Sequence, residues 1–229
     1  MTLHEYKDVD QGSDEWLDLR RGLITASTIG RLITPKTIKP AGNPDSRALI
    51  AELAAERIAG WSDPVYVNSH MQRGKDCEPL ARDLYSERYA PVTEIGFLVE
   101  DNVGGNGFKL GYSPDGLVSA DGLIEVKAPE AKTHIQTILS GEVPPGNMAQ
   151  CQSGLLVSGR DWLDFLSYSP GLPMWRTRVL PDPRWAEAII ATVEQAELAI
   201  ESMVNRYQGA VIGLPATERI VELEMVIGA

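Results

Sequence analysis

Apolar residues recur every three or four positions in several stretches of the chain, which predicts amphipathic helices. The clearest stretches are residues 46–60, about 70–89 and 183–207, and the first of them ends at a glycine. The last of these has one apolar stripe that should cover a core: Trp185, Ile189, Val193, Ala196, Ile200 and Val204. Residues 131–157 predict further helix on both sides of a Pro-Pro break.

Residues 11–33 predict two helices separated by a break. Ser13 is a suitable cap for the first helix, which has acidic residues in its first turn and Gly22 just past its end. Thr25 is a suitable cap for the second, with Ser27 near its start. The free backbone N–H groups of that second terminus would favour an anion, and ordinary capping is the more common alternative. Residues 34–46, rich in proline, glycine and polar residues, predict a mobile loop.

After Pro91 the pattern changes from helical spacing to alternation, which predicts short strands separated by glycine and asparagine turns. The first four should form an antiparallel meander, with a hairpin turn rather than a phosphate loop at the glycine-rich residues 104–108. Two later strands would make the sheet mixed. The strands are expected within residues 92–99, 107–113, 115–119, 123–128, 162–168 and 175–180. The tail alternates from Val221 to Met225 and predicts an edge strand or a subunit contact.

These elements predict one α/β (α+β) domain over residues 1–229, with a central mixed sheet flanked by helices. The net charge of −11 argues against a basic nucleic-acid coat and against binding to anionic membranes. The negative charge does not exclude an enzyme that acts on DNA, because divalent cations in an acidic site supply positive charge locally. The two cysteines, Cys77 and Cys151, should be reduced, and no apolar run is long enough to span a bilayer, so we expect a cytoplasmic protein.

Candidate chemistry is concentrated in residues 111–129, GYSPDGLVSADGLIEVKAP. Alternation in a strand places Glu125 and Lys127 on one face, opposite Ile124 and Val126. The preceding hairpin would bring Asp115 beside them. Two carboxylates and the Val126 carbonyl would then suit Mg²⁺ or Mn²⁺, with Lys127 positioning or helping to deprotonate a water molecule. For the Glu-x-Lys triplet alone, a surface ion pair on an edge strand is the commoner alternative; the upstream Ser-Pro-Asp-Gly favours a site.

The pattern of Pro-Asp followed by Glu-x-Lys in the next hairpin resembles the PD-(D/E)XK nuclease superfamily. SPDGL and LIEVKAP are similar in particular to the phage lambda exonuclease, or YqaJ-type viral recombinase, family. Further similarity lies in QGSDEWLDLRRGLITAS, RGKDCEPLARDLY and NMAQCQ, so that the resemblance covers about residues 11–155 in order. It implies a restriction-endonuclease-like core.

The resemblance also implies site residues. Asp115, Glu125 and the Val126 backbone would bind metal, Lys127 would be catalytic, and Glu78 would be a second-metal or water-positioning carboxylate. Taken alone, Glu78 would be read as an i,i+4 surface partner of Arg82. The terminal 5′-phosphate of DNA would be bound by Arg20, Ser27 and Gln150. The implied activity is 5′-to-3′ digestion of one strand of linear duplex DNA to mononucleotides, with Mg²⁺ or Mn²⁺ and two ions per active site.

Met71 lies two helical turns before Glu78 and should share its face. We expect it to help separate the strands as an apolar wedge, with core packing as the alternative. The family further implies a ring-shaped homotrimer around DNA and a single-strand annealing protein as partner. Other classes of function stay open: a PD-(D/E)XK endonuclease or RecB-like nuclease domain, and a non-catalytic module that binds DNA ends.

Overall fold

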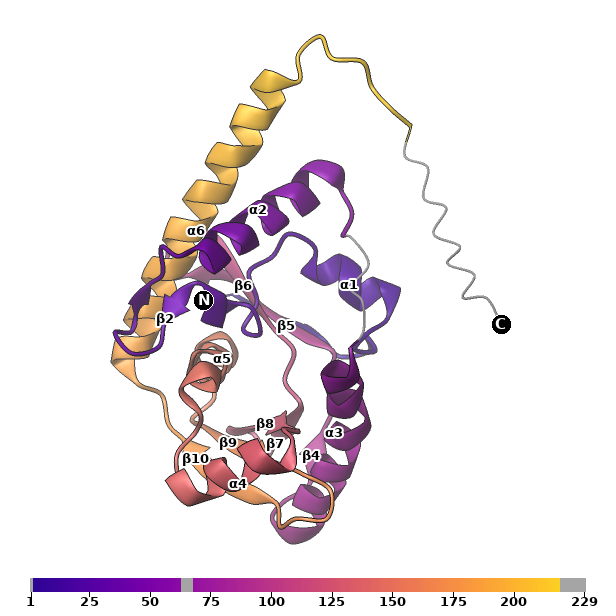
Figure 1. Ribbon diagram of the computed structural model, residues 1–229, viewed down its shortest axis with the longest axis vertical. Helices are drawn as coiled ribbons and strands as arrows, with labels where there is room; N and C mark the ends of the chain where they lie inside the picture. Colours follow the sequence, from indigo (N-terminus) through magenta and orange to yellow (C-terminus); the bar gives the residue numbers. More distant parts are fainter. Residues whose placement is uncertain (1, 63–67, 219–229) are drawn as a thin grey trace.

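The computed structural model describes residues 2–62 and 68–218, so the predicted edge strand at Val221–Met225 lies outside the described residues. A five-stranded mixed sheet has the strand order β10-β9-β8-β7-β4. Its strands are antiparallel except for the parallel pair of β8 and β9. They comprise β4 (Val92–Thr93), β7 (Gly116–Val118), β8 (Gly122–Lys127), β9 (Trp162–Ser167) and β10 (Trp175–Val179). The predicted mixed α/β class is confirmed (Figure 1).

A second, three-stranded antiparallel sheet has the order β1-β5-β6. It consists of β1 (Leu3–Tyr6), β5 (Phe97–Val103) and β6 (Phe108–Tyr112). The prediction of one continuous meander is therefore wrong, because β5 and β6 belong to this sheet whereas β7 and β8 belong to the other. The chain crosses between the sheets at Ser113-Pro114-Asp115, where proline has no N–H group with which to continue a ladder. The crossing places Asp115 at the junction of the two sheets.

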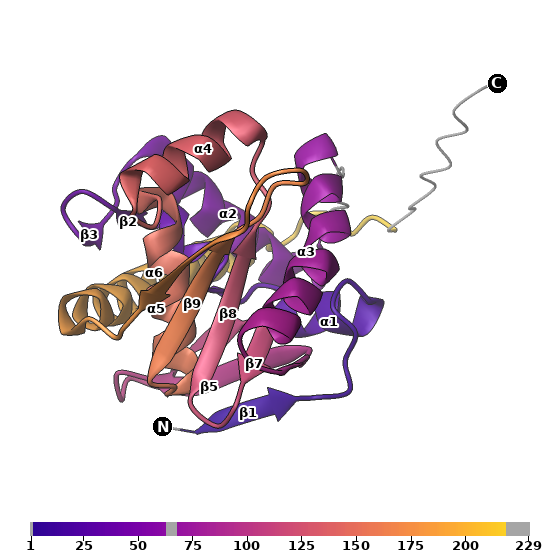
Figure 2. The ribbon, with the colours of Figure 1, turned by 90° about the horizontal axis from the view of Figure 1, so that it is seen from below.

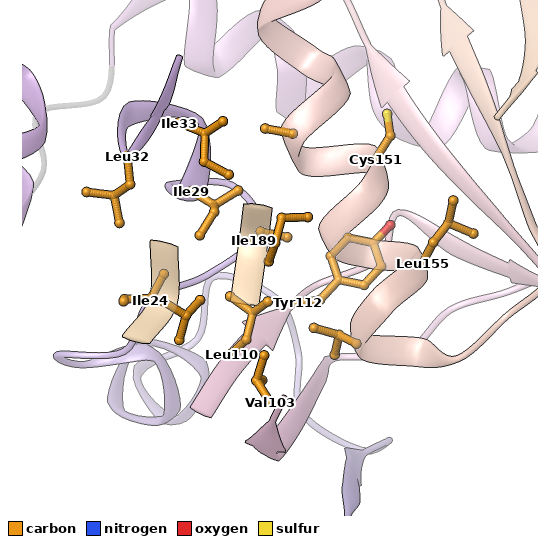
Figure 3. Close-up of a cluster of buried hydrophobic side chains, with 14 of the residues drawn as sticks. Ile24, Ile29, Leu32, Ile33, Val103, Leu110, Tyr112, Cys151, Leu155 and Ile189 are labelled. Atoms are coloured by element: carbon orange, nitrogen blue, oxygen red, sulfur yellow. The ribbon is translucent and has the colours of Figure 1, made fainter. Parts of the chain in front are cut away.

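The described part of the chain has six α-helices: α1 (Asp14–Arg20), α2 (Pro44–Ala59), α3 (Ser69–Arg88), α4 (Ala131–Ser140), α5 (Pro145–Ser158) and α6 (Pro183–Ala210). Helix α3 packs against β8 and β4, and α5 packs against β9. Figure 2 shows α3 lying along β7 and β8, where Ala81 and Tyr85 pack with Ile124 and Val126. The larger core lies on the opposite face and includes residues of β6, β8, β9, α5 and α6. Figure 3 shows part of it, with Tyr112 directed toward α5.

The predicted helix after Thr25 is wrong. Residues 26–28 form a turn, followed by only a short 3₁₀ helix, η1 (Ile29–Arg31). The Thr28 hydroxyl bonds both the N–H and the carbonyl of Thr25, and Ala26 N–H donates to the Gly111 carbonyl. These bonds compete with helical bonds and tie the turn to β6. The anion site expected from a helix N-terminus at Ser27 therefore has no such helix.

The predicted loop at residues 34–46 is shorter than expected, and its mobility stays a prediction. Its first part forms a hairpin of β2 (Ile33–Thr34) and β3 (Lys39–Pro40), and Asn43 then caps α2 by accepting a hydrogen bond from Ser46 N–H. The other predicted helices are present, with ends within about three residues of those expected. Strand β1 was not predicted, because its residues are mostly exposed and show no alternation. Within residues 2–62 and 68–218, no helix combines the length and apolar character needed to cross a bilayer.

Gly22, which follows the predicted phosphate-binding Arg20, offers a test of the packing beside the site. Gly22 and Gly60 have similar positive φ angles, +65° and +67°. An added Cβ at Gly22 would lie 2.6 Å from Cγ of Arg57, whereas nothing lies within 4 Å at Gly60. Arg57 is held by a two-point ion pair with Glu197 and by the Gly22 carbonyl.

Gly22→Ala is expected to lower the free energy of unfolding by about 2–3 kcal/mol, and Gly60→Ala by about 1 kcal/mol. Both substitutions strain the backbone, but only the first also displaces Arg57. Chemical denaturation of the two variants measures the difference. Equal losses would contradict a rigid Arg57 contact.

Candidate active site

The β7–β8 hairpin brings Asp115 against the centre of the sheet. Gly116 pairs with Ile124, and just beyond this pair Asp115 Oδ2 accepts a hydrogen bond of 2.6 Å from Val126 N–H. Strand β8 lies between β7 and β9, and Glu125 is only 1% exposed. A surface ion pair on an edge strand, the alternative for Glu125 and Lys127, is therefore wrong. The predicted placement of Glu125 and Lys127 opposite Ile124 and Val126 is confirmed.

The Val126 carbonyl faces the same side of β8 as Asp115. Tyr168 N–H donates to the Lys127 carbonyl, which directs that carbonyl toward β9. Successive carbonyls of a strand point to opposite sides, so the Val126 carbonyl points toward β7. The β7–β8 ladder has ended by this position, since its last pair is Gly116 with Ile124. The carbonyl is thus positioned to act with Asp115 as an oxygen ligand.

Three acidic side chains influence one another at this end of β8. Burial raises the pKa of Asp115 well above its usual range, and the charges of Glu125 and Glu78 add to the effect. Burial also raises the pKa of Glu78, against the attraction of Arg82 and together with repulsion from Glu125. Such repulsion between carboxylates is relieved by a cation.

Lys127 is a cation that the cluster holds in addition to Arg82, the partner of Glu78. Its Nζ donates to Glu125 Oε1 at 2.7 Å. Burial disfavours the charged amine, but Glu125 and Asp115 outweigh that effect and raise the pKa of Lys127. In the metal-free protein Lys127 is therefore protonated and donates its hydrogen bond to Glu125.

The donor set fits a hard divalent ion. Asp115, Glu125 and the Val126 carbonyl supply only oxygen, the ligand type that Mg²⁺ and Mn²⁺ prefer. In the described part of the chain, no three acidic, histidine or cysteine side chains converge as a ready-made metal site. An ion at this position would therefore be completed by the backbone carbonyl and by water. Glu78 is bound by Arg82 at 2.8 Å, so it would exchange that partner to reach an ion.

Arg20 lies at the centre of a group of hydroxyls. Its guanidinium donates to Ser113 Oγ at 3.2 Å, to Thr25 Oγ1 at 3.4 Å and to Ser27 Oγ at 3.0 Å. It stacks on Trp16, with 4.1 Å from Cζ to the ring centroid. Burial lowers the pKa of Arg20 to about 10, against the attraction of Glu56. Among the described residues no carboxylate forms an ion pair with Arg20.

Gln150 is placed less directly. It lies in α5, which packs against η1 just after Ser27, and it is partly buried. No hydrogen bond joins its side chain to Arg20 or Ser27 within the described residues. The structure therefore joins Arg20 and Ser27 through a hydrogen bond, and brings Gln150 near only through the packing of two elements.

A cavity of about 1130 Å³ extends from Arg20 to the acidic residues Glu78 and Asp115. Its lining includes Arg20, Met71, Glu78 and Asp115, together with Lys75, but not Glu125, Lys127, Ser27 or Gln150. Met71 is 40% exposed, so the alternative that it packs in the core is wrong. Its role in strand separation stays a prediction.

Trp16 and Gln11 hold the segment before Asp115 through contacts that the sequence did not predict. Trp16 Nε1 donates to Ser113 Oγ at 2.9 Å. The Gln11 amide donates to the carbonyls of Ile95 and Pro114, at 3.1 and 3.0 Å. These partners are 84 or more residues apart in the chain, and neither periodicity nor spacing signals them. Tyr112, the other residue missed, donates to Glu125 Oε2 at 3.3 Å.

The mixed sheet, with Asp115 at a hairpin end beside Glu125 and Lys127, defines a nuclease core of the PD-(D/E)XK fold. The sequence model of the YqaJ-like viral recombinase domain matches residues 15–161, and the chain belongs to this family. Among curated protein sequences, none gives a significant match.

Solved structures agree with this assignment. The chain is 32% identical to an alkaline exonuclease from Laribacter hongkongensis, with a TM-score of 0.77, covering 89% of this chain and 100% of that one. The same figures hold for that exonuclease in complex with dAMP. A phage-related exonuclease from Haemophilus somnus 129PT is 13% identical with a TM-score of 0.61, covering 81% of this chain and 96% of that one, and shows a similar fold.

Proposed function

We propose that the protein is a metal-dependent 5′-to-3′ exonuclease that digests one strand of linear duplex DNA from a 5′-phosphorylated end. The observation that carries the proposal is the connection between Arg20 and the acidic cluster. Arg20, which forms no ion pair with a carboxylate of the described residues, donates to Ser113 Oγ, and Ser113 lies two residues before Asp115. A terminal phosphate bound at Arg20 would therefore lie close to the site of hydrolysis. Family membership and the exonuclease relatives support the same function.

The residues have complementary tasks in this proposal. The guanidinium of Arg20 and the Ser27 hydroxyl would bind the terminal phosphate, and an amide donor from Gln150 would add to them. Lys127 would hold the attacking water by hydrogen bonding, and Glu78 would orient it or take part in binding a second ion. A divalent ion, Mg²⁺ or Mn²⁺, held by Asp115, Glu125 and the Val126 carbonyl would polarise the phosphodiester. A fixed end-binding group beside the acidic cluster would produce digestion of one polarity.

The wider assembly is proposed from family membership. A homotrimeric ring would keep DNA in a central channel while the acidic exterior, part of a net charge of −11, repels other DNA. The product, a 3′ single strand, would be the substrate of a single-strand annealing protein in recombination.

The test is digestion of a linear duplex that carries a 5′-phosphate at one end and a 5′-hydroxyl at the other, with and without Mg²⁺. We expect metal-dependent release of mononucleotides, mainly from the phosphorylated strand. Cleavage of closed circular DNA would instead indicate an endonuclease. Binding of ends without metal-dependent hydrolysis would indicate a non-catalytic module.

Met71→Ala is expected to slow digestion of duplex DNA several-fold relative to single-stranded DNA. Its side chain is exposed in the cavity that Glu78 and Asp115 also line, where an apolar group can insert between bases. Rates on a duplex and on its separated phosphorylated strand measure the ratio. Leu17→Ala is a matched control, because Leu17 is an exposed apolar residue elsewhere in the same lining. An unchanged ratio for Met71→Ala would end the wedge hypothesis.

A further inference from the structure

Tyr112 is a buried tyrosine at the end of β6, in a core made almost entirely of apolar side chains. It is 1% exposed and packs with Leu110, Leu155 and Cys151 among others. Burying a hydroxyl in such a core is unfavourable unless the hydroxyl is hydrogen-bonded. The Tyr112 hydroxyl finds its partner in Glu125 Oε2, at 3.3 Å.

Helix α5 makes room for the ring. A Cβ added at Gly154 would lie 2.6 Å from Tyr112 Cζ and 3.0 Å from the hydroxyl oxygen. Glycine in the middle of a helix is destabilising by about 0.5–1 kcal/mol relative to alanine, so its presence here calls for a packing reason. The close contact with Tyr112 is that reason. Figure 3 shows the ring directed toward α5.

Tyr112 and Lys127 together account for both oxygens of Glu125. Lys127 Nζ binds Oε1 at 2.7 Å, and the Tyr112 hydroxyl binds Oε2. A carboxylate held at both oxygens has one orientation, although Asp115 and Glu78 repel it.

We infer that Tyr112 is a positioning residue, which orients Glu125 for binding of a divalent ion, and that Gly154 is the glycine that admits its ring. The inference rests on the proposed function, because it gives Glu125 the role of a metal ligand. Tyr112 would act through Glu125 and would touch neither the ion nor DNA. Hydrogen bonds to ligating carboxylates generally raise metal affinity or activity about 10- to 100-fold.

The test is Tyr112→Phe, which keeps the ring and removes only the hydroxyl. Mn²⁺ binding to the DNA-free protein is measured by calorimetry, alongside the Mg²⁺ concentration that gives half-maximal digestion. We expect both to weaken by about 10-fold or more. Gly154→Ala should weaken Mn²⁺ binding in the wild-type background, and should have no further effect on it in the Tyr112→Phe background.

Tyr85→Phe is the matched control. Tyr85 is also 1% exposed, and its hydroxyl donates to the buried carboxylate of Asp164 at 2.7 Å, in the core on the α3 face of the sheet. Tyr85→Phe should lower the midpoint of thermal unfolding in chelator while leaving Mn²⁺ affinity unchanged. Wild-type Mn²⁺ affinity in Tyr112→Phe would overturn the inference alone. No Mn²⁺ binding and no digestion by the wild-type protein would overturn the proposed function and the inference together.

Discussion

Asp115→Asn is expected to reduce metal-dependent digestion of DNA by about 10³-fold or more. The change removes a charged oxygen ligand, and an ion that stabilises charge in the transition state contributes several kcal/mol to catalysis. Asparagine retains an oxygen that accepts the hydrogen bond from Val126 N–H, so the hairpin keeps its geometry. Initial rates on the 5′-phosphorylated duplex, at saturating Mg²⁺, measure the loss.

The same substitution is expected to stabilise the metal-free protein at alkaline pH. Since the folded-state pKa of Asp115 lies well above 3.8, its ionised form opposes folding when the pH exceeds that raised value. This penalty shrinks as the pH falls below the raised pKa, where folded Asp115 takes up a proton, and it is gone below the unfolded-state pKa near 3.8. Asparagine cannot ionise. The variant should therefore unfold at a higher temperature than the wild type in chelator at pH 8, with a smaller difference at acidic pH.

Mg²⁺ should reverse that order, because it stabilises the wild-type cluster and has little effect on the variant. Asp121→Asn is a suitable control: Asp121 is an exposed acidic residue in the loop that joins β7 to β8. It should alter neither the rate nor the Mg²⁺ response. Retention of metal-dependent activity by Asp115→Asn would contradict its assignment as a ligand.

Arg20→Lys is expected to reduce the preference for 5′-phosphorylated over 5′-hydroxyl ends by about 10- to 100-fold. A hydrogen bond to a charged group contributes about 1.5–3 kcal/mol, and lysine retains the charge while losing the planar fork. The effect should fall on phosphorylated ends, since a hydroxyl end offers Arg20 no terminal phosphate. Competition between the two labelled ends in one reaction measures the preference.

Arg31→Lys is the matched control for Arg20. Arg31 lines the same cavity, but its guanidinium is bound by Asp45 and Glu52. It should therefore leave the preference for phosphorylated ends unchanged. Equal effects of the two substitutions would indicate that general positive charge in the cavity, rather than a phosphate site at Arg20, determines the preference.

Local sequence patterns predicted the elements whose formation depends on neighbouring residues. Ser13 and Gly60 mark helix ends because their bonds and backbone angles involve only neighbouring residues. Alternation in β8 correctly separated Glu125 and Lys127 from Ile124 and Val126. The prediction of a helix after Thr25 was wrong because a long-range contact determines the structure there: the turn is bound to Gly111, a residue far away in the chain. The assigned roles of Glu78, Arg20, Ser27 and Gln150 came from family resemblance, since no local pattern marks them.

By itself, the sequence determined the class of fold, the strand that carries Glu125 and Lys127, and the family to which the chain belongs. Only the tertiary structure decided that β8 is a central strand, because strand order depends on pairing between distant segments. It also decided that Glu125 is buried and held by Tyr112, and that Arg20 reaches the segment before Asp115. These contacts join residues that periodicity does not relate, since packing in three dimensions brings them together.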